Sequence, residues 1–321
     1  MWVVRDLQES GIVSVGSLLT DWRIFFAWEG ARQGLNVWSI LTVCWEELKM
    51  MDYRIKPDCR FTLKEFDPDD TGGYKKHDAG KAKAKSTADG LIAKLDQLQE
   101  RLYANGNRAL LIVLQGMDTS GKDGTIKSVM SGVNPQGCRV ASFKSPSEKE
   151  LGYDFLWRVH QEVPPKGYIG IFNRSHYEDV LITHVHGWVS DKVITQRLDQ
   201  INEFEEMLVE NGTSILKLFL HISKDEQKER LTERVCDPEK RWKFSEGDLE
   251  ERKLWDAYMK SFEGVLSATS TPHAPWYVVP ANRKWYRNLV VAELVVQVLM
   301  AMNLSTPPAP KGVNFHKLKI V

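Results

Sequence analysis

The sequence predicts an α/β fold: a doubly wound parallel sheet of about five strands, with helices on both faces and a helical lid. Three observations predict it. Short, continuously apolar segments alternate with longer amphipathic segments, a glycine-rich loop follows the first apolar segment, and a charged stretch with aromatic residues follows the fourth. Continuous apolar runs are typical of parallel strands covered on both faces, and such strands are joined by right-handed helical crossovers.

The strands and helices can be placed in order along the chain. An Ala/Lys/Leu-rich segment over 81–102 puts Ile92, Leu95, Leu98 and Leu102 on one face, which predicts an amphipathic helix. The expected strands lie at 109–115, 139–143, 168–172, 214–220 and 276–279. One helix is expected to begin near residue 122. Further helices are expected over 148–159, 191–209, 224–235, 254–265 and 283–302.

The chain is expected to have four parts. These are an atypical extension over 1–50, an N-terminal segment and helix over 51–106, the α/β domain over 107–304 with its lid around 224–265, and a tail over 305–321. The extension holds five of the eleven tryptophans and has no helical or strand periodicity. It also lacks the features of a signal or transit peptide. We therefore hypothesise that translation starts at Met50 or Met51; a genuine accessory extension is the alternative.

Composition excludes some classes of protein. The 43 basic and 43 acidic side chains among 321 residues give no net charge, which argues against covering a nucleic acid or a membrane by bulk charge. We therefore expect no nucleic-acid and no membrane partner. The four cysteines are far apart and form no CxxC pair, which favours reduced thiols in a cytoplasmic protein.

The glycine-rich loop carries the clearest chemical signal. Residues 116–122, Gly-Met-Asp-Thr-Ser-Gly-Lys, match the P-loop pattern G-x-x-x-x-G-K between an expected strand and an expected helix. Gly116 and Gly121 would let backbone N–H groups face phosphate oxygens, and Lys122 would add a positive charge. Gly124 and Thr125, in the first helical turn, are further phosphate-binding candidates. The alternative is a strand–turn–helix junction that happens to be rich in glycine.

Two carboxylates set this loop apart from the usual P-loop. Asp123 stands after the lysine, where Ser or Thr ordinarily binds Mg²⁺, and Asp118 lies inside the loop. Carboxylates would repel phosphate unless a divalent cation lay between them, so the pair predicts a Mg²⁺-dependent site. For Asp123 the alternative is an acidic residue stabilised by the helix dipole.

A second polar cluster, residues 173–179, follows the third strand. In a doubly wound sheet, the carboxyl ends of the strands border the ligand site, so this cluster should face the P-loop. Asn173 replaces the usual metal-binding aspartate, and Asp118 and Glu178 are the candidate metal ligands in its place. Arg174 would pair with phosphate oxygens. The alternative is a helix-capping box formed by Ser175 and Glu178.

Further cations are candidates for binding a polyanion. Lys144 stands at the end of the second strand and Arg158 in the helix after it. The expected lid contains Lys240, Arg241 and Lys243 among six cations within residues 228–243, with Trp242 and Phe244 between them. Such a lid would exclude water during transfer. A surface helix with salt bridges is the alternative.

Several separated motifs closely resemble the polyphosphate kinase 2 family over residues 53–302. Besides the P-loop, they are Val-Asn-Pro-Gln-Gly at 133–137, Phe-Lys-Ser-Pro at 143–146, Phe-Leu-Trp-Arg at 155–158, Ile-Phe-Asn-Arg-Ser-His-Tyr-Glu-Asp at 171–179, Asp-Pro-Glu-Lys-Arg-Trp-Lys-Phe-Ser at 237–245 and Arg-Lys-Trp-Tyr-Arg-Asn at 283–288. Phe-Asp-Pro-Asp-Asp at 66–70 also fits.

This resemblance implies a P-loop kinase-like fold and Mg²⁺-dependent phosphoryl transfer between inorganic polyphosphate and nucleotides. The Asn-Arg-Ser-His-Tyr-Glu form resembles the branch that phosphorylates both AMP and ADP, forming ADP and ATP. The resemblance also implies functional roles at six positions: Asp118, Lys122, Lys144, Arg158, Arg174 and Glu178. We further expect a homo-oligomer. An ATP-dependent nucleoside or nucleotide kinase and a nucleotide-switch binding protein are the alternatives.

Overall fold

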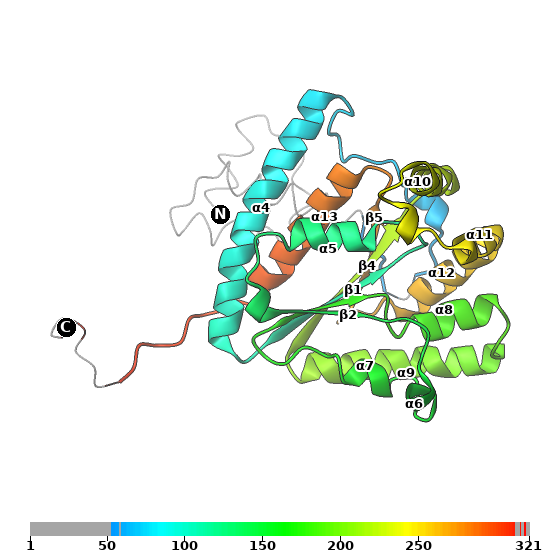
Figure 1. Ribbon diagram of the computed structural model, residues 1–321. Helices are drawn as coiled ribbons and strands as arrows, with labels where there is room; N and C mark the ends of the chain where they lie inside the picture. Colours follow the sequence, from blue (N-terminus) through cyan, green and yellow to red (C-terminus); the bar gives the residue numbers. More distant parts are fainter. Residues whose placement is uncertain (1–52, 58, 312–314, 316–317, 319–321) are drawn as a thin grey trace, which may run out of the picture. The chain divides into compact units, whose positions relative to one another are not determined.

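The computed structural model describes residues 53–321 except 58, 312–314, 316–317 and 319–321 (Figure 1). The proposed start at Met50 or Met51 and the extension before it lie outside these residues. The predicted sheet is confirmed: five parallel strands lie in the order β2-β3-β1-β4-β5. They are β1 (Ala109–Gln115), β2 (Cys138–Ser142), β3 (Ile169–Asn173), β4 (Thr213–His221) and β5 (Trp276–Pro280).

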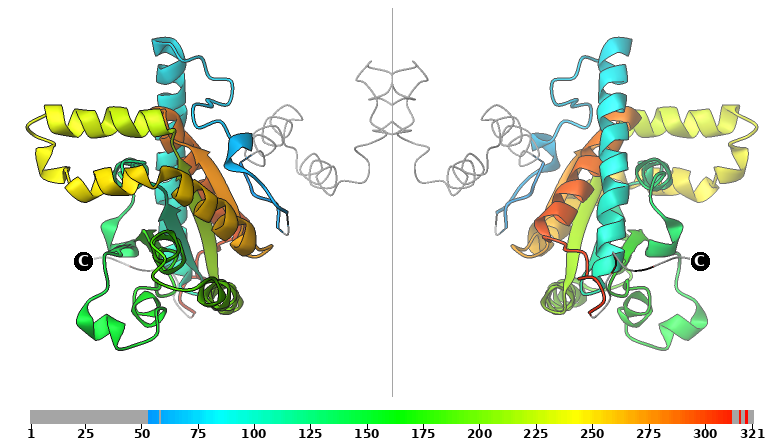
Figure 2. Two further views of the ribbon diagram at one scale, coloured as in Figure 1. Left: turned by 90° about the vertical axis from the view of Figure 1, so that its right-hand side faces the viewer. Right: turned by 90° about the vertical axis from the view of Figure 1, so that its left-hand side faces the viewer.

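Helices cover both faces of the sheet, as Figures 1 and 2 show. One face carries α4 (Asp78–Asn105), α5 (Lys122–Val129) and α13 (Lys284–Ala301), with α13 in contact with both others. The opposite face carries α8 (Glu178–Val185), α9 (Asp191–Glu210) and α12 (Trp255–Thr269), which contact one another. Because β1 has neighbours on both sides and helices above and below, all seven of its residues are buried, which explains its unbroken apolar sequence.

The lid segment (residues 224–265) leaves the sheet after β4. It runs through α10 (Lys224–Cys236), the 3-10 turn η4 (Arg241–Lys243) and α11 (Glu246–Lys253) into α12. Figure 2 shows α10 and α11 projecting from the body of the molecule, whereas α12 packs against α8 and α9. The shorter elements are η2 (Leu63–Glu65), η3 (Pro135–Gly137), α6 (Glu148–Leu151) and α7 (Trp157–His160).

The prediction of one helix over 148–159 is wrong. The chain forms α6 and α7, separated by residues 152–156. Ser147 and Glu150 form a capping box that starts α6, which ends at Gly152. Asp154 then accepts a hydrogen bond from the Leu156 N–H at 3.0 Å, which competes with a continuous helix. Two helices were not predicted, α8 and α11.

Membrane insertion finds no support in the described part of the chain, where no helix is both long and apolar enough to cross a bilayer. The long apolar helix α13 packs on α4, α5 and the sheet. Cys59, Cys138 and Cys236 carry free thiols; Cys44 lies outside the described residues.

Candidate active site

The P-loop connects β1 to α5, in the strand–loop–helix context that the sequence predicts. Gly116 and Gly121 have φ angles of 149° and 98°. At Gly121 a glycine is required twice over, because of this left-handed φ and because a Cβ atom would lie 2.0 Å from Arg287 Nη1. Thr119 also has a positive φ of 68°, which is unusual for a β-branched residue.

The P-loop carbonyl groups are turned toward the protein. Gln227 Nε2 donates to the Asp118 carbonyl at 3.1 Å, and Arg230 Nη1 donates to the Thr119 and Ser120 carbonyls at 2.8 and 3.1 Å. Arg287 Nη1 adds a second bond to the Ser120 carbonyl, at 3.2 Å. Satisfying the carbonyls from behind leaves the N–H side of the loop for an anion, as in phosphate-binding loops.

Lys122, Asp118 and Arg174 come together as the sequence predicts. Lys122 Nζ donates to the Gly116 carbonyl at 2.7 Å, and Arg174 forms an ion pair with Asp118 at 2.6 Å. Burial alone would raise the pKa of Asp118, but Lys122 and Arg174 outweigh it and hold that pKa below its ordinary value. Burial lowers the pKa of Lys122, with Asp118 opposing. The loop therefore holds an ionised carboxylate between two cations.

Glu178 occupies a different electrostatic environment at the start of α8. Burial raises its pKa above the ordinary value, Asp118 adds to the rise, and Arg174 and Lys122 oppose it in part. With its amide nitrogen turned toward Glu178, Gln115 donates to Oε1 at 3.0 Å. The alternative capping box is not formed, because Tyr177 is the N-cap of α8 and Ser175 Oγ accepts from the Tyr177 N–H at 3.2 Å.

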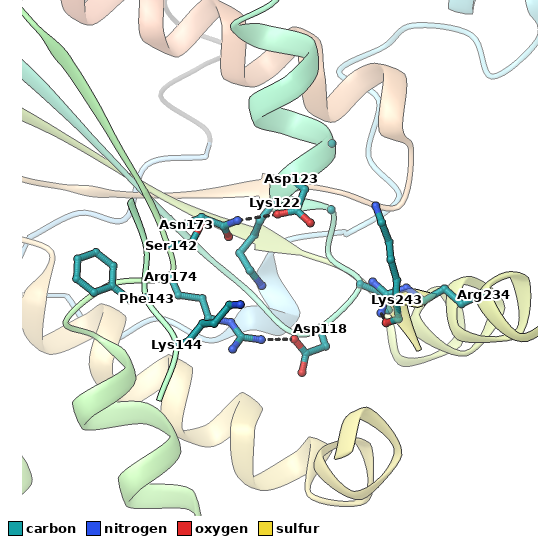
Figure 3. Close-up of a pocket in the computed structure, with 13 residues that line it drawn as sticks. Asp118, Lys122, Asp123, Ser142, Phe143, Lys144, Asn173, Arg174, Arg234 and Lys243 are labelled. Atoms are coloured by element: carbon teal, nitrogen blue, oxygen red, sulfur yellow. Dashed lines mark hydrogen bonds and ion pairs between the residues drawn. The ribbon is translucent and has the colours of Figure 1, made fainter. Parts of the chain in front are cut away.

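Asn173 and Asp123 interact across the neighbouring ends of β3 and α5. Asn173 Nδ2 donates to Asp123 Oδ1 at 2.6 Å (Figure 3). Both side chains line the same cavity as the P-loop. Asp123 thus faces the site as well as standing in the first turn of α5, so both of its proposed roles agree with its position.

Apart from Glu178, which is not among its lining residues, these groups border a cavity of about 410 Å³ (Figure 3). Eight of the candidate residues line it: Asp118, Gly121, Lys122, Asp123, Gly124, Lys144, Arg174 and Lys243. Gly116 belongs to the loop behind them, and Thr125 donates its hydroxyl to the Gly121 carbonyl at 3.1 Å. The structure also adds Arg234, which lines the cavity from the lid segment.

A second cavity of about 590 Å³ borders the first and shares Ser142, Phe143 and Lys144 with it. Arg158 lines this second cavity, where its Nη1 donates to the Lys144 carbonyl at 2.8 Å and its Nη2 lies 3.4 Å from Asp179. Arg158 is buried, although its position in a helix alone would have indicated an exposed side chain. It was predicted as a site residue only because it belongs to a motif of the family.

The predicted lid cations divide into two sets. Of the three, Lys243 reaches the first cavity, together with Arg234, which was not among the predicted site residues and which pairs with Asp248 at 3.0 Å. Lys240 pairs with Asp237 at 2.9 Å, and Arg241 Nε donates to the Val235 carbonyl at 2.9 Å; both are exposed. Helical spacing could have identified Arg234, since it lies on the same face of α10 as Gln227 and Arg230.

The donor set agrees with Mg²⁺ but not with a site made by protein ligands alone. Among the described residues, no group of three or more His, Cys, Asp or Glu side chains is placed to hold a metal. Mg²⁺ usually takes one or two carboxylates, several waters and substrate phosphates. Asp118 and Glu178 could supply the carboxylates, and a bound phosphate chain would supply the rest.

Comparison with known proteins gives consistent matches. The family model described as Polyphosphate kinase 2 matches residues 76–307. An AMP/ADP-polyphosphate phosphotransferase from Meiothermus ruber is 54% identical over 258 residues, which are 80% of this chain and 96% of that protein. An ADP-polyphosphate phosphotransferase from Rhodopseudomonas palustris is 46% identical over 228 residues, 67% of this chain and 79% of that one. A crystal structure of polyphosphate kinase 2 from Arthrobacter aurescens superposes with a TM-score of 0.78 at 44% identity, covering 81% of this chain and 92% of that chain.

Proposed function

The chain belongs to the polyphosphate kinase 2 family, and from this premise we propose that it transfers phosphoryl groups reversibly between inorganic polyphosphate and nucleotides, converting AMP and ADP to ADP and ATP. The observation that carries the proposal is the pair of adjoining cavities that meet at Lys144. A transfer between two phosphate chains needs two cationic sites that share a wall, and each of these cavities is lined by basic side chains.

The reaction places three negatively charged groups close together: the donor chain, the transferred phosphoryl group and the acceptor phosphate. Lys122 and Arg174 neutralise charge at the P-loop end, and the backbone N–H groups of the loop align the donor. Lys144 and Arg158 serve the second cavity. No general base is required, because the acceptor is a phosphate oxygen whose second pKa is about 6, so it is largely ionised at neutral pH.

Mg²⁺ would be held by Asp118 and Glu178. The ion would neutralise phosphate oxygens and so lower the repulsion between donor and acceptor. Lys122 and Arg174 hold the pKa of Asp118 below its ordinary value against the effect of burial, which favours the ionised form that a metal ligand needs. Arg174, which pairs with Asp118 in the structure, is placed to move to a phosphate oxygen when substrate arrives.

The lid segment would complete the site from the opposite side. Arg234 and Lys243 already line the first cavity, and Figure 3 shows them approaching from the side opposite Lys144 and Arg174. Lys240 and Arg241 lie outside the cavity wall, so their proposed contact with polyphosphate would involve the part of the chain that extends beyond it.

The test is an assay with polyphosphate as the sole phosphoryl donor and AMP or ADP, separately, as acceptor. The proposal expects ADP and ATP from AMP, ATP from ADP, and no product in excess chelator. Transfer from ATP but none from polyphosphate would instead favour an ATP-dependent nucleotide kinase. Slow hydrolysis without an acceptor, together with nucleotide-dependent binding of a protein, would favour a nucleotide switch.

Two further expectations stay predictions: a cytoplasmic location and a homo-oligomeric state. The free thiols of Cys59 and Cys236, both exposed, are compatible with a reducing compartment. Light scattering coupled to size-exclusion chromatography would measure the mass in solution, and a mass near 36.8 kDa would contradict an oligomer.

A further inference from the structure

The connection between β3 and α8 contains three consecutive residues with no exposed surface: Ser175, His176 and Tyr177. Loops usually run over the surface, because a buried loop must find partners for its backbone. The two residues on either side of this tripeptide, Arg174 and Glu178, belong to the candidate active site. The loop is therefore held in the core at its centre; Arg174 at one end lines the first cavity, and Glu178 at the other interacts electrostatically with Arg174 and Lys122.

A buried ion pair holds the centre of the loop. The Tyr177 hydroxyl donates to Glu205 Oε1 at 2.7 Å and accepts from Lys217 Nζ at 3.0 Å. Lys217 Nζ also donates to Glu205 Oε2 and to the Thr269 carbonyl, both at 2.6 Å. All three protons of the ammonium group are thus used. We call Tyr177, Glu205 and Lys217 the buried anchor.

Stability alone is a weak reason for this arrangement. Removing two charges from water costs free energy, and well-packed apolar residues in place of a buried ion pair often leave a protein equally stable or more stable. The ion pair does fix the position of the Tyr177 hydroxyl, because that group forms two hydrogen bonds to different elements, one to α9 and one to β4.

The backbone beside the anchor is strained. Arg174 has a φ of 61°, in the left-handed region that non-glycine residues rarely adopt, while its N–H bonds to the Leu114 carbonyl at 3.1 Å. Such a conformation costs free energy and persists only where the surrounding structure enforces it. His176 and Tyr177, two and three residues further on, are both fully buried and both contact Glu205, and Tyr177 also contacts Lys217.

We propose that Tyr177, Glu205 and Lys217 are positioning residues that hold Arg174 and Glu178 in register with the P-loop for phosphoryl transfer. This inference rests on the proposed function for its reaction. None of the three lines either of the two cavities. Their effect reaches the reaction through the strained backbone at Arg174 and through the first residue of α8.

Tyr177→Phe tests the proposal, with Tyr53→Phe as a matched control. Tyr53 is also a buried tyrosine whose hydroxyl donates to a carboxylate, that of Asp70, but it contacts Tyr286 and lies outside the site. We expect similar losses of thermal midpoint in both variants. In Tyr177→Phe alone, kcat should fall about 10–100-fold while KM for AMP and polyphosphate changes less than about twofold. Equal kcat values in the two variants would overturn the proposal.

The double variant Lys217→Met/Glu205→Leu tests the charged partners of Tyr177. It replaces the ion pair with apolar side chains but also leaves the buried Tyr177 hydroxyl, His176 Nε2 and the Thr269 carbonyl without these partners, so we expect a lower thermal midpoint than that of the wild type. We also expect the lowered kcat of Tyr177→Phe and an unchanged Kd for nucleotide by calorimetry. A wild-type kcat in this variant would contradict the inference.

The failure of the proposed function can be told apart from failure of the inference. If the wild-type protein uses ATP and not polyphosphate as donor, the proposed function is wrong. The two tyrosine variants can then be compared in the ATP-dependent reaction. There we again expect a lower kcat in Tyr177→Phe than in Tyr53→Phe.

Discussion

Two groups of cations, one behind the P-loop and one at the tip of the lid segment, differ in burial and in the partners they bind. Arg230 and Arg287, behind the loop, are buried and donate to its carbonyl oxygens. Lys240 and Arg241, at the tip of the lid segment, are exposed, and Lys240 pairs with Asp237 of its own turn. The difference teaches that burial and partner type separate cations that support the backbone of the loop from cations that stay free to bind a ligand, which is the role we propose for Lys240 and Arg241.

Replacing a cation of the first group should cost more folding free energy than replacing one of the second. A buried carbonyl that loses its donor costs about 1–3 kcal/mol, and Arg230 bonds four of them. Exposed ion pairs contribute little to folding because water competes for both partners. Mutations of the first group should therefore be seen in stability, and mutations of the second in substrate binding.

The largest loss of activity should come from substituting Lys122, which both supports the loop backbone and faces the cavity. It donates to the Gly116 carbonyl and also faces the cavity. Lys122→Ala should lower kcat about 1,000-fold or more, because a cation at the transferred phosphoryl group is lost, and Asp118→Asn should also abolish transfer. Both variants should keep the wild-type circular dichroism spectrum. Substantial residual transfer in either would contradict the site assignment.

Arg230 and Arg234, one turn apart on α10, give the sharpest comparison. Arg230→Met should lower the free energy of unfolding by about 3 kcal/mol, measured by urea denaturation, since several buried carbonyls lose their donor. Arg234→Met should leave unfolding nearly unchanged and raise KM for polyphosphate, because this side chain lines the cavity. Equal effects of the two substitutions on unfolding would break the distinction.

Within the lid segment, Lys243 and the pair Lys240 and Arg241 should also differ. Lys243→Ala should raise KM for short polyphosphate about fivefold and make it less sensitive to salt, since Lys243 lines the cavity. Lys240→Ala/Arg241→Ala should have a smaller effect on short chains than on long ones. If the double variant were the more damaging with short chains, the lid tip would have to lie over the cavity.

The smallest expected change in stability concerns the carboxylate of Glu178. Glu178 has a raised pKa in the folded protein, so folding favours its protonated form, and stability falls as pH rises from the ordinary pKa through the raised one. Glu178→Gln should therefore raise the thermal midpoint at pH 7 in chelator and leave it unchanged below pH 4, while transfer is lost. No gain at neutral pH would contradict the raised pKa.

Local sequence patterns predicted much of the fold, because burial on both faces leaves a continuous apolar run. The strand β1 was predicted at its observed bounds, and the start of α5 followed from the P-loop. By contrast, Gly152 and Asp154 divide the predicted helix over 148–159 because a local side-chain hydrogen bond outweighs the apolar spacing.

The candidate site was predicted where chemistry is local and missed where it is long-range. Asp118, Lys122 and Arg174 follow from motifs at two strand ends, and they do meet. The bond from Arg287 to the Ser120 carbonyl joins residues 167 positions apart, which no periodicity reveals. Likewise, Lys217 and Tyr177 come from separate elements and meet only because β4 and α8 are brought together by the fold.

The bonds that Gln227 and Arg230 make to the P-loop have a mechanical consequence. They clamp the first two turns of α10 to the loop and, through the Ala281 and Asn282 carbonyls, to the end of β5. The helix is thus a lever fixed at one end. If the lid segment moves, it must bend beyond Arg230. The displacement then grows toward Lys240 and Arg241, while the start of α10 stays bonded to the phosphate-binding loop.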